Sequence, residues 1–282
     1  MKRNHAETVL TSVPYLIWMV VFTVIPLLLV TYFAFTDETG AFTGETGAFT
    51  MANLSAVREY VAVIFRSIWL AFIATMLCLL IAYPLSYIIS RAPQRRQRTY
   101  LLLVMLPMWI NFLLRTYAWM TLLENTGIIN RMLGIIGIGQ LSMINTQGAV
   151  VLGMVYNYLP FMILPLYSVM TKIENSLIEA AQDLGAPRST VFSSVVLPLS
   201  MPGVMTGITM VFVPAVSTFI ISRMLGGGSN MMIGDLIELQ CLGNAYNPNL
   251  GAAISLGLMI LILFCMSMLN QLNEEDKEGM II

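Results

Sequence analysis

The chain has 282 residues, of which 57% are hydrophobic and only 10% are charged, and its formal net charge is −1. A soluble domain carries about 25% charged residues, whereas the mean hydropathy here is +0.80. These values exclude an ordinary soluble domain and predict an integral membrane protein, with membrane lipid and no nucleic acid among its partners.

Residues that would support catalysis or metal binding are scarce. His5 is the single histidine and lies in the N-terminal tail, and the three cysteines, Cys78, Cys241 and Cys265, show no metal-binding or disulfide spacing. We therefore expect no catalytic residue, no metal site and no enzyme activity in this chain.

The first predicted element is an apolar segment at 13–35, preceded by a tail at 1–12. A signal peptide has an apolar core of about 7 to 15 residues and a small-residue cleavage site. This segment is longer and lacks such a site, so it is predicted to be an uncleaved first transmembrane helix. The following loop, 36–60, carries the direct repeat ETGAFT at 38–43 and 45–50, to which we assign no chemistry.

Six apolar segments match or exceed the ~20 residues that cross a ~30 Å hydrocarbon core. The prediction is therefore an all-α polytopic membrane protein with six transmembrane helices, five of which form a core at 61–270, followed by an acidic tail at 271–282. The segments lie at 13–35, 64–90, 100–123, 147–171, 199–222 and 250–270.

Positive charges orient these spans, because cytoplasmic loops carry an excess of lysine and arginine. Three arginines, Arg58, Arg131 and Arg223, fall on one side, and nine positive residues fall on the other. Both termini and the segment 172–198 are therefore predicted to be cytoplasmic, and 36–60 extracellular. The nine are Lys2, Arg3, Arg91, Arg95, Arg96, Arg98, Lys172, Arg188 and Lys277.

The segment 172–198 is a polar island between two apolar spans. Gly185 suits the left-handed residue that ends a helix, and Pro187 follows two residues later, which predicts two short helices meeting at the glycine. Ala180 and Ala181 leave a surface of low relief, which is typical of a helix that docks into another protein.

This segment resembles the EAA loop of ABC-importer permeases in the spacing of its residues. Glu-Ala-Ala is followed after three residues by Gly, and after nine more residues by an aliphatic residue, one further residue and Leu-Pro. Val195 stands where isoleucine is common in that family. The segments 106–117, 158–167 and 179–185 are similar to the permeases of spermidine/putrescine importers, and among them to the B-type subunit. The resemblance runs from about 60 to 270, and the repeat region lies outside it. The residues that match the loop are Glu179, Ala180, Ala181, Gly185, Val195, Leu197 and Pro198.

The resemblance implies a type I permease fold in the cytoplasmic membrane of a bacterium. It implies that two permeases form the pathway and that an external polyamine-binding protein delivers the substrate. It also implies that two cytoplasmic ATPase subunits each accept an EAA helix, which in this chain includes Asp183. The second permease is expected to be a homologue, and a homodimer stays open. The chain contains no Gly-x-x-x-x-Gly-Lys pattern, so ATP and Mg²⁺ are expected on the ATPase and no cofactor on this chain.

Recognition of a polyamine calls for carboxylates along its length and aromatic faces for its ammonium groups. Acidic residues outnumber arginines on the predicted outer side, although the bias against external positive charge explains such an excess in any membrane protein. Glu124, Asp235 and Glu238 are either a mouth that receives the cation or a solvated polar face. The full set of candidate pathway residues is Asn111, Arg115, Tyr117, Trp119, Glu124, Tyr156, Tyr158, Asp235 and Glu238.

Arg115 lies inside the third predicted span, where a charge at the bilayer centre costs at least ~2.5 kcal/mol. Asn111, Arg115 and Trp119 recur every four residues and share one helical face. A structural arginine, paired with Glu124 or with helix carbonyls, is one interpretation. The other is an arginine that holds an acidic partner in place or guards the gate. Direct binding conflicts with charge, because an arginine repels a polycation.

Two other functions are compatible with parts of the sequence. The permease of an ABC importer for another small substrate has the same loop. An ion-coupled secondary transporter requires carboxylates within its spans, and the six segments contain essentially none, which argues against it.

Overall fold

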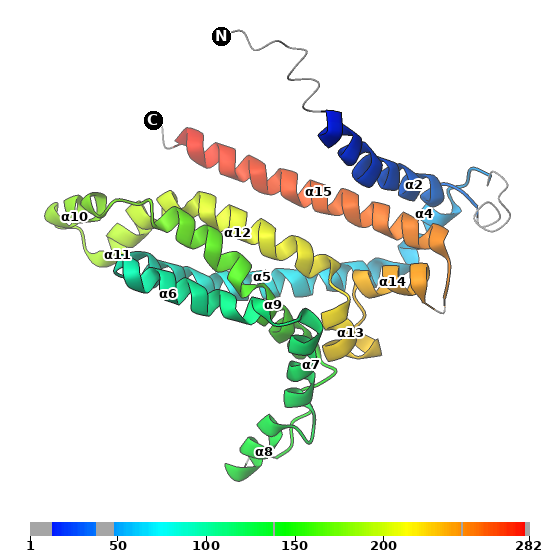
Figure 1. The fold of residues 1–282 in the computed structure, drawn as a ribbon, viewed down its shortest axis with the longest axis horizontal. Helices are drawn as coiled ribbons and strands as arrows, with labels where there is room; N and C mark the ends of the chain where they lie inside the picture. Colours follow the sequence, from blue (N-terminus) through cyan, green and yellow to red (C-terminus); the bar gives the residue numbers. More distant parts are fainter. Residues whose placement is uncertain (1–12, 38–47, 138, 244, 280–282) are drawn as a thin grey trace, which may run out of the picture. The chain divides into compact units, whose positions relative to one another are not determined.

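The computed structural model describes residues 13–37, 48–137, 139–243 and 245–279 (Figure 1). Within these ranges the regular structure is helical, and the only bridge found joins Thr36 to Phe49. The chain divides into two compact units, Met1–Val61 with Leu236–Leu261, and Ala62–Asp235 with Ile262–Ile282.

The first helix of the first unit accommodates a proline through a π-helical turn. Its helix Val13–Ala34 contains the turn η1 (Val20–Val24), which α2 (Ile25–Ala34) follows with Pro26 in its first turn. The N–H of Ile25 donates to the carbonyl of Val20, five residues earlier. Because proline has no N–H and clashes with the carbonyl four residues back, the extra residue lets the helix continue past it.

The same unit contains a helix that the sequence did not indicate. The elements α4 (Ala52–Ala56) and η2 (Val57–Tyr60) lie in the segment predicted as a loop, and they lead directly into α5 (Val61–Arg91). The short α4 has no apolar periodicity to reveal it. Its start is fixed locally, since the Thr50 hydroxyl accepts a hydrogen bond from the Ala52 N–H at 3.1 Å.

The second unit is a group of long helices around α9 (Gln147–Met170), the most buried of them. Ser86 of α5 donates to the carbonyl of Ile163 in α9 at 3.2 Å. Gly203 and Gly207 of α12 (Leu197–Ser217) face α9 so closely that a Cβ on Gly203 would lie 3.1 Å from the Pro165 carbonyl oxygen. Small residues four apart therefore let the two helices approach, as in many membrane proteins.

Among the described residues, five helices are long and apolar enough to cross a membrane, and one bent pair would add a sixth. This agrees with the six spans predicted from hydropathy when the bent pair counts as one. The five are Val13–Ala34, Ala52–Arg91, Gln147–Met170, Arg188–Ser217 and Pro248–Met268; the pair is Gln94–Trp109 with Phe112–Ile135.

The third span is not the single straight helix that the apolar run 100–123 predicts. The segment α6 (Gln94–Met105) with η3 (Leu106–Trp109) and the segment that starts with α7 (Phe112–Leu123) meet at 86°. Pro107 favours the tight turn of η3, Ile110 is extended, and the side chain of Asn111 caps α7 by accepting from the N–H groups of Leu113 and Leu114.

At the end of the second unit that α7 reaches lie the short helices α8 (Ile128–Ile135), α13 (Ile220–Gly226) and η5 (Gly228–Asn230). The helix α14 (Ile233–Leu242) begins in this unit and continues in the first. Asn230 donates to the carbonyls of Asn145 and Gly226, both at 2.9 Å, and Arg66 of α5 donates to the carbonyl of Ser229 at 2.6 Å. The opposite end carries the loop 171–196 (Figure 1).

Candidate functional site

The polar segment after α9 forms the two short helices that its sequence predicts. These are α10 (Asn175–Asp183) and α11 (Arg188–Val191), with Gly185 between them at φ +83°. The N–H of Ala186 donates to the carbonyl of Ala181, and the N–H of Gly185 to that of Gln182. This is a Schellman motif, which ends a helix with a left-handed residue that glycine adopts without steric cost.

The surface of α10 is exposed along its length. No residue of this helix is buried, and Glu179, Ala180 and Asp183 all face solvent. Leu177 is 49% exposed and Leu184, just after the helix, is 89% exposed. Two carboxylates and two uncovered leucines on a short helix form a surface suited to docking into a groove on a partner. We call the segment 171–196 the coupling loop.

The Leu-Pro pair that ends the motif also has a structural reason. The π-helical turn η4 (Phe192–Val196) lies between α11 and α12, and the N–H of Leu197 donates to the carbonyl of Phe192, five residues back. Pro198 follows directly and has no N–H. The arrangement repeats the π turn before Pro26, so the coupling loop runs into the span as one continuous helical path, Arg188–Ser217.

A hollow of about 390 Å³ lies between the coupling loop and α5. Residues of α10 and α11 line one side of it, and Tyr87 of α5 lines the other. The lining residues are Tyr87, Ile178, Gln182, Arg188, Val191, Phe192 and Val196. Protein interiors are normally close-packed, so the hollow means that Ile178 and Gln182 of α10 are not packed closely against Tyr87 of α5.

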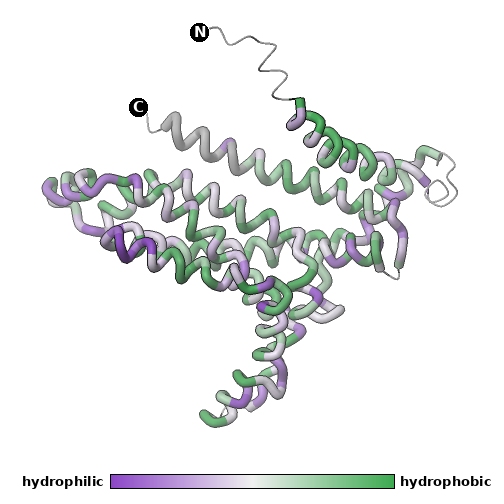
Figure 2. Tube along the Cα trace, in the orientation of Figure 1, coloured by the Kyte–Doolittle hydropathy of each residue, from purple (hydrophilic) through white to green (hydrophobic). Residues whose placement is uncertain are grey.

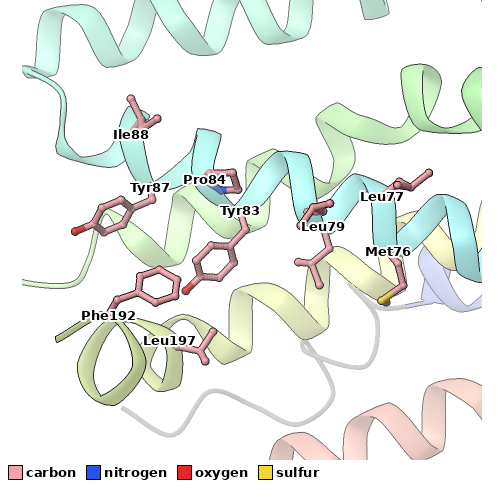
Figure 3. A pocket seen from close by; sticks show the side chains of 10 residues that line it. Met76, Leu77, Leu79, Tyr83, Pro84, Tyr87, Ile88, Phe192 and Leu197 are labelled. Carbon is pink, nitrogen blue, oxygen red and sulfur yellow. The ribbon is translucent and has the colours of Figure 1, made fainter. Parts of the chain in front are cut away.

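An apolar groove of about 760 Å³ adjoins this hollow and shares Tyr87 and Phe192 with it (Figure 3). The ring of Tyr83 packs edge-on against Phe192 at 5.6 Å between centroids, and its hydroxyl lies 2.8 Å from that of Ser200. No carboxylate lines the groove. It therefore offers apolar and aromatic surface and no charge for a cationic ligand.

Three of the nine predicted pathway residues meet at the junction of α7 and α9. The rings of Trp119 and Tyr156 pack edge-on with centroids 5.3 Å apart. The guanidinium carbon of Arg115 lies 5.9 Å from the Tyr156 ring centroid and 5.8 Å from that of Phe112. We call Arg115, Trp119 and Tyr156 the aromatic cluster.

The structure distinguishes the two pairings proposed for Arg115. Its Nη1 donates to the carbonyl of Pro107 at 2.6 Å, and within the described ranges no ion pair with Glu124 is found. The Pro107 carbonyl lies within η3 and also accepts the N–H of Ile110 at 3.3 Å, so Arg115 binds where the helical path bends. Arg115 therefore fastens α7 to η3.

The other pathway candidates lie apart from the aromatic cluster. Asn111 caps α7, Tyr117 is 55% exposed, and Glu124 is exposed at the end of α7. The hydroxyl of Tyr158 donates to the carbonyl of Pro214 in α12 at 3.3 Å. A contribution of these side chains to a substrate pathway stays a prediction.

Asp235 and Glu238 do not form the exposed acidic pair that their spacing suggests. Asp235 is only 5% exposed, and its Oδ2 accepts the N–H of Met232 at 2.8 Å, just before α14 begins. Glu238 is half-buried. The carboxylate of Asp235 thus fixes the start of a helix, in the manner of a capping box.

Asp235→Ala is therefore expected to lower the free energy of unfolding by about 1–3 kcal/mol, since it leaves the buried N–H of Met232 without its acceptor. Asp235→Asn keeps an acceptor oxygen and should stay close to wild type. Thermal unfolding of the two variants in detergent measures the difference. Equal midpoints for alanine and asparagine would contradict the capping role.

Two residues at the other end were not singled out as site residues from the sequence. The sequence indicates only a topological role for Arg91, yet its side chain donates to the Ile173 carbonyl and to Asn175 at the start of the coupling loop. No pattern in the sequence marks Gln97, yet its side chain donates to the carbonyls of Ser90 and Ala92. The Arg91 contacts join residues far apart in the chain, and the Gln97 contacts reach across the end of α5. No local sequence pattern indicates either of them.

Comparison with known proteins gives the family. The family of binding-protein-dependent transport system inner membrane components matches residues 82–274. The spermidine/putrescine transport system permease protein PotB of Haemophilus influenzae is 38% identical over 248 residues, covering 87% of this chain and 86% of its own length. Its Escherichia coli counterpart is 34% identical over 249 residues, covering 87% and 90%.

Solved structures show the same architecture. A bacterial ABC transporter that imports the acidic polysaccharide alginate contains a chain with a TM-score of 0.76 at 17% identity, covering 95% of both chains. The methionine ABC transporter MetNI gives 0.57 at 19% identity, covering 77% of this chain and 95% of that one. These likenesses show the fold and confirm the predicted all-α, type I importer permease architecture. From the family match and the identity to its curated relatives, we conclude that this chain belongs to the binding-protein-dependent transport system inner membrane components.

Proposed function

We propose that the chain is a permease subunit of an ATP-driven importer for the polyamines spermidine and putrescine. Its curated relatives, at 34–38% identity over most of their length, carry that transport system in their names. Within the structure, the observation that carries the proposal is the exposed helix α10, ended at Gly185. The chain has no phosphate loop of its own. An exposed helix of this kind allows it to receive the energy of ATP hydrolysis from another subunit.

The proposed partners follow from the same surface. Two cytoplasmic ATPase subunits bind ATP and Mg²⁺, and one accepts α10 through Glu179, Asp183 and the uncovered leucines at 177 and 184. A second, homologous permease supplies the other half of the pathway. An external binding protein delivers the polyamine at the end of the second unit that carries α8 and α13.

The orientation rests on charge. Hydrophilic residues gather over α10 and the start of α6 in the second unit (Figure 2), where Arg91, Arg95, Arg98, Lys172 and Arg188 lie. Positive loops favour the cytoplasm. We therefore place the coupling loop in the cytoplasm, with both termini on the same side.

The aromatic cluster is the proposed substrate contact. Aromatic faces attract ammonium groups by about 0.5–2 kcal/mol, and the Trp119–Tyr156 pair offers two such rings at the bend of the third span. The guanidinium of Arg115 donates to the Pro107 carbonyl, and Arg115 therefore serves to position α7. It keeps the polycation from resting beside η3.

Tyr156→Ala is expected to reduce spermidine uptake by about tenfold, because it removes one ring face and the edge-on partner of Trp119. Tyr156→Phe keeps the ring and should retain most uptake. Initial rates with labelled spermidine, at equal amounts of membrane-inserted protein, measure the change. Equal loss in both variants would point to the hydroxyl and away from a cation–ring contact.

The substrate class is tested in cells that lack this chain and its own polyamine synthesis. Restoring the chain should restore uptake of labelled spermidine, and unlabelled putrescine should compete where an unrelated amino acid or an anion does not. Unchanged polyamine uptake on deletion, with loss of another solute's uptake, would favour a permease of the same family for that other solute.

A further inference from the structure

The coupling helix α10 is attached to the rest of the second unit at few points. None of its residues is buried. Among the hydrogen bonds of the described residues, only one joins an α10 side chain to a helix outside the coupling loop: Asn175 Oδ1 accepts from Nη1 of Arg91, at 2.5 Å. The other α10 side-chain hydrogen bond, from Ser176 to Glu174, stays within the loop.

Arg91 is the last residue of α5, and its side chain is held on several sides. The same Nη1 donates to the carbonyl of Ile173 at 3.1 Å. The guanidinium carbon lies 5.5 Å from the centroid of the Tyr87 ring, one helical turn earlier. A planar, permanently charged group that bonds two loop residues and stacks on its own helix is a rigid connection.

Neighbouring arginines provide the contrast. Arg95, Arg96 and Arg98 follow within two turns, yet within the described ranges their side chains make no hydrogen bond or ion pair. A role in membrane orientation alone accounts for those three. It does not account for Arg91, which bonds the loop through Nη1 while its Nε and Nη2 are buried without a hydrogen-bond partner among the described residues.

The corner to which Arg91 belongs is itself braced. Gln97 of α6 donates to the carbonyls of Ser90 and Ala92, at 3.0 and 2.7 Å, which closes the end of α5. The hydroxyl of Tyr167 in α9 donates to the side-chain oxygen of Gln97 at 2.9 Å. The ends of α5, α6 and α9 therefore form one hydrogen-bonded block beside the coupling loop.

Where it faces Tyr87 of α5, α10 borders the hollow of about 390 Å³ lined by Ile178 and Gln182. A helix that borders empty space on one side and a rigid connection at its first residue has room to tilt about that connection. A push on the exposed face of α10 then reaches α5 at the Arg91 contact, because the interface along the hollow lacks close packing. The contacts of α10 with α11 and η4 lead instead into α12.

We propose that Arg91 is the positioning residue through which movement of α10 reaches α5 and the corner braced by Gln97. This inference rests on the proposed function, in which an ATPase subunit moves α10. It assigns docking and transmission to different residues: Glu179 and its neighbours receive the partner, and the Arg91–Asn175 contact passes the displacement on.

The first experiment separates these two steps in the complete transporter. For Arg91→Gln we expect the ATPase subunits to co-purify as in wild type. The amount of substrate transported per ATP hydrolysed should fall about tenfold, because the variant loses hydrogen bonds made by a charged group. Arg95→Gln removes the same charge from the same corner and should behave as wild type. Asn175→Ala, at an exposed site that tolerates truncation, should lower the same ratio to a smaller extent.

Non-additivity is the sharper criterion. If the two side chains act as one connection, the Arg91→Gln/Asn175→Ala double variant should transport no worse per ATP than Arg91→Gln alone. Strictly multiplied losses, wild-type coupling in Arg91→Gln, or loss of the ATPase subunits from that variant would each overturn the proposal. By contrast, normal ATPase association in Glu179→Lys would refute the proposed docking function and leave the Arg91 result interpretable by itself.

A covalent replacement tests sufficiency. In the Arg91→Cys/Asn175→Cys variant, coupling should be low and should rise several-fold when a short, reducible dithiol cross-linker joins the two positions, then fall again on reduction. Wild type treated with the same reagent is the control for the three native thiols, Cys78, Cys241 and Cys265. Burial of Cys78 and the raised pKa of the partly buried Cys241 thiol lower the reactivity of those two. A cross-linked pair that stays as uncoupled as the reduced one would contradict transmission at this joint.

Discussion

Glu179→Lys is expected to abolish polyamine uptake while leaving membrane insertion intact. Glu179 lies on the exposed face of α10, and among the described residues its side chain makes no hydrogen bond or ion pair, so the substitution removes no polar contact within this chain. A like-charge contact across an interface costs several kcal/mol, and uptake should therefore fall by at least about 30-fold.

Co-purification of the ATPase subunits with the tagged permease, measured beside uptake, identifies the step that fails. Both should be lost together. Glu275→Lys makes the same charge reversal in the acidic tail and serves as the matched control. If Glu179→Lys retained the ATPase subunits and normal uptake, α10 would have no role in docking.

Gly185→Val is expected to cause the second largest loss, for a reason confined to the backbone. Gly185 has φ +83°, and a Cβ there would meet no other atom within 4 Å. The cost is therefore the left-handed conformation, about 1–2 kcal/mol for a residue with a Cβ, and a β-branched side chain is the least suited to it. The angle between α10 and α11 should be lost in most molecules, with uptake reduced about 5- to 30-fold.

Gly185→Asn gives the matched comparison, because asparagine tolerates the left-handed region. It should keep most uptake and ATPase association. Gly134→Val, at another glycine with open space but without a positive φ, controls for the side chain added. Equal activity of the valine and asparagine variants at position 185 would show that the Schellman turn does not set the docking geometry.

The sequence predicted the parts of the fold that depend on local chemistry. Hydropathy located the spans because a bilayer requires about 20 apolar residues in a row. Gly185 and Pro187 predicted the turn between α10 and α11 because few residues adopt a positive φ. The bend at Ile110 and Asn111 escaped notice, since a hydropathy window averages over Pro107 and the capping asparagine, although both residues are visible signals in retrospect.

The candidate site was less accessible from sequence, because its contacts join distant positions. The spacing of Asp235 and Glu238 indicated a shared face but not that Asp235 is buried against the backbone of Met232. Likewise, Arg115, Trp119 and Tyr156 were separate candidates until the fold placed α7 beside α9. Arg91 and Asn175 are 84 residues apart, and only the packing of the coupling loop against α5 brings them into contact.

The most direct test of the central claim is transport by the reconstituted assembly. The chain, its partner permease, the ATPase subunits and the binding protein are placed in liposomes, with ATP supplied on the side of the coupling loop. We predict accumulation of labelled spermidine that requires ATP and the binding protein and that disappears with Glu179→Lys. Accumulation driven by an ion gradient without ATP, or ATP-driven accumulation that Glu179→Lys leaves unchanged, would contradict the account.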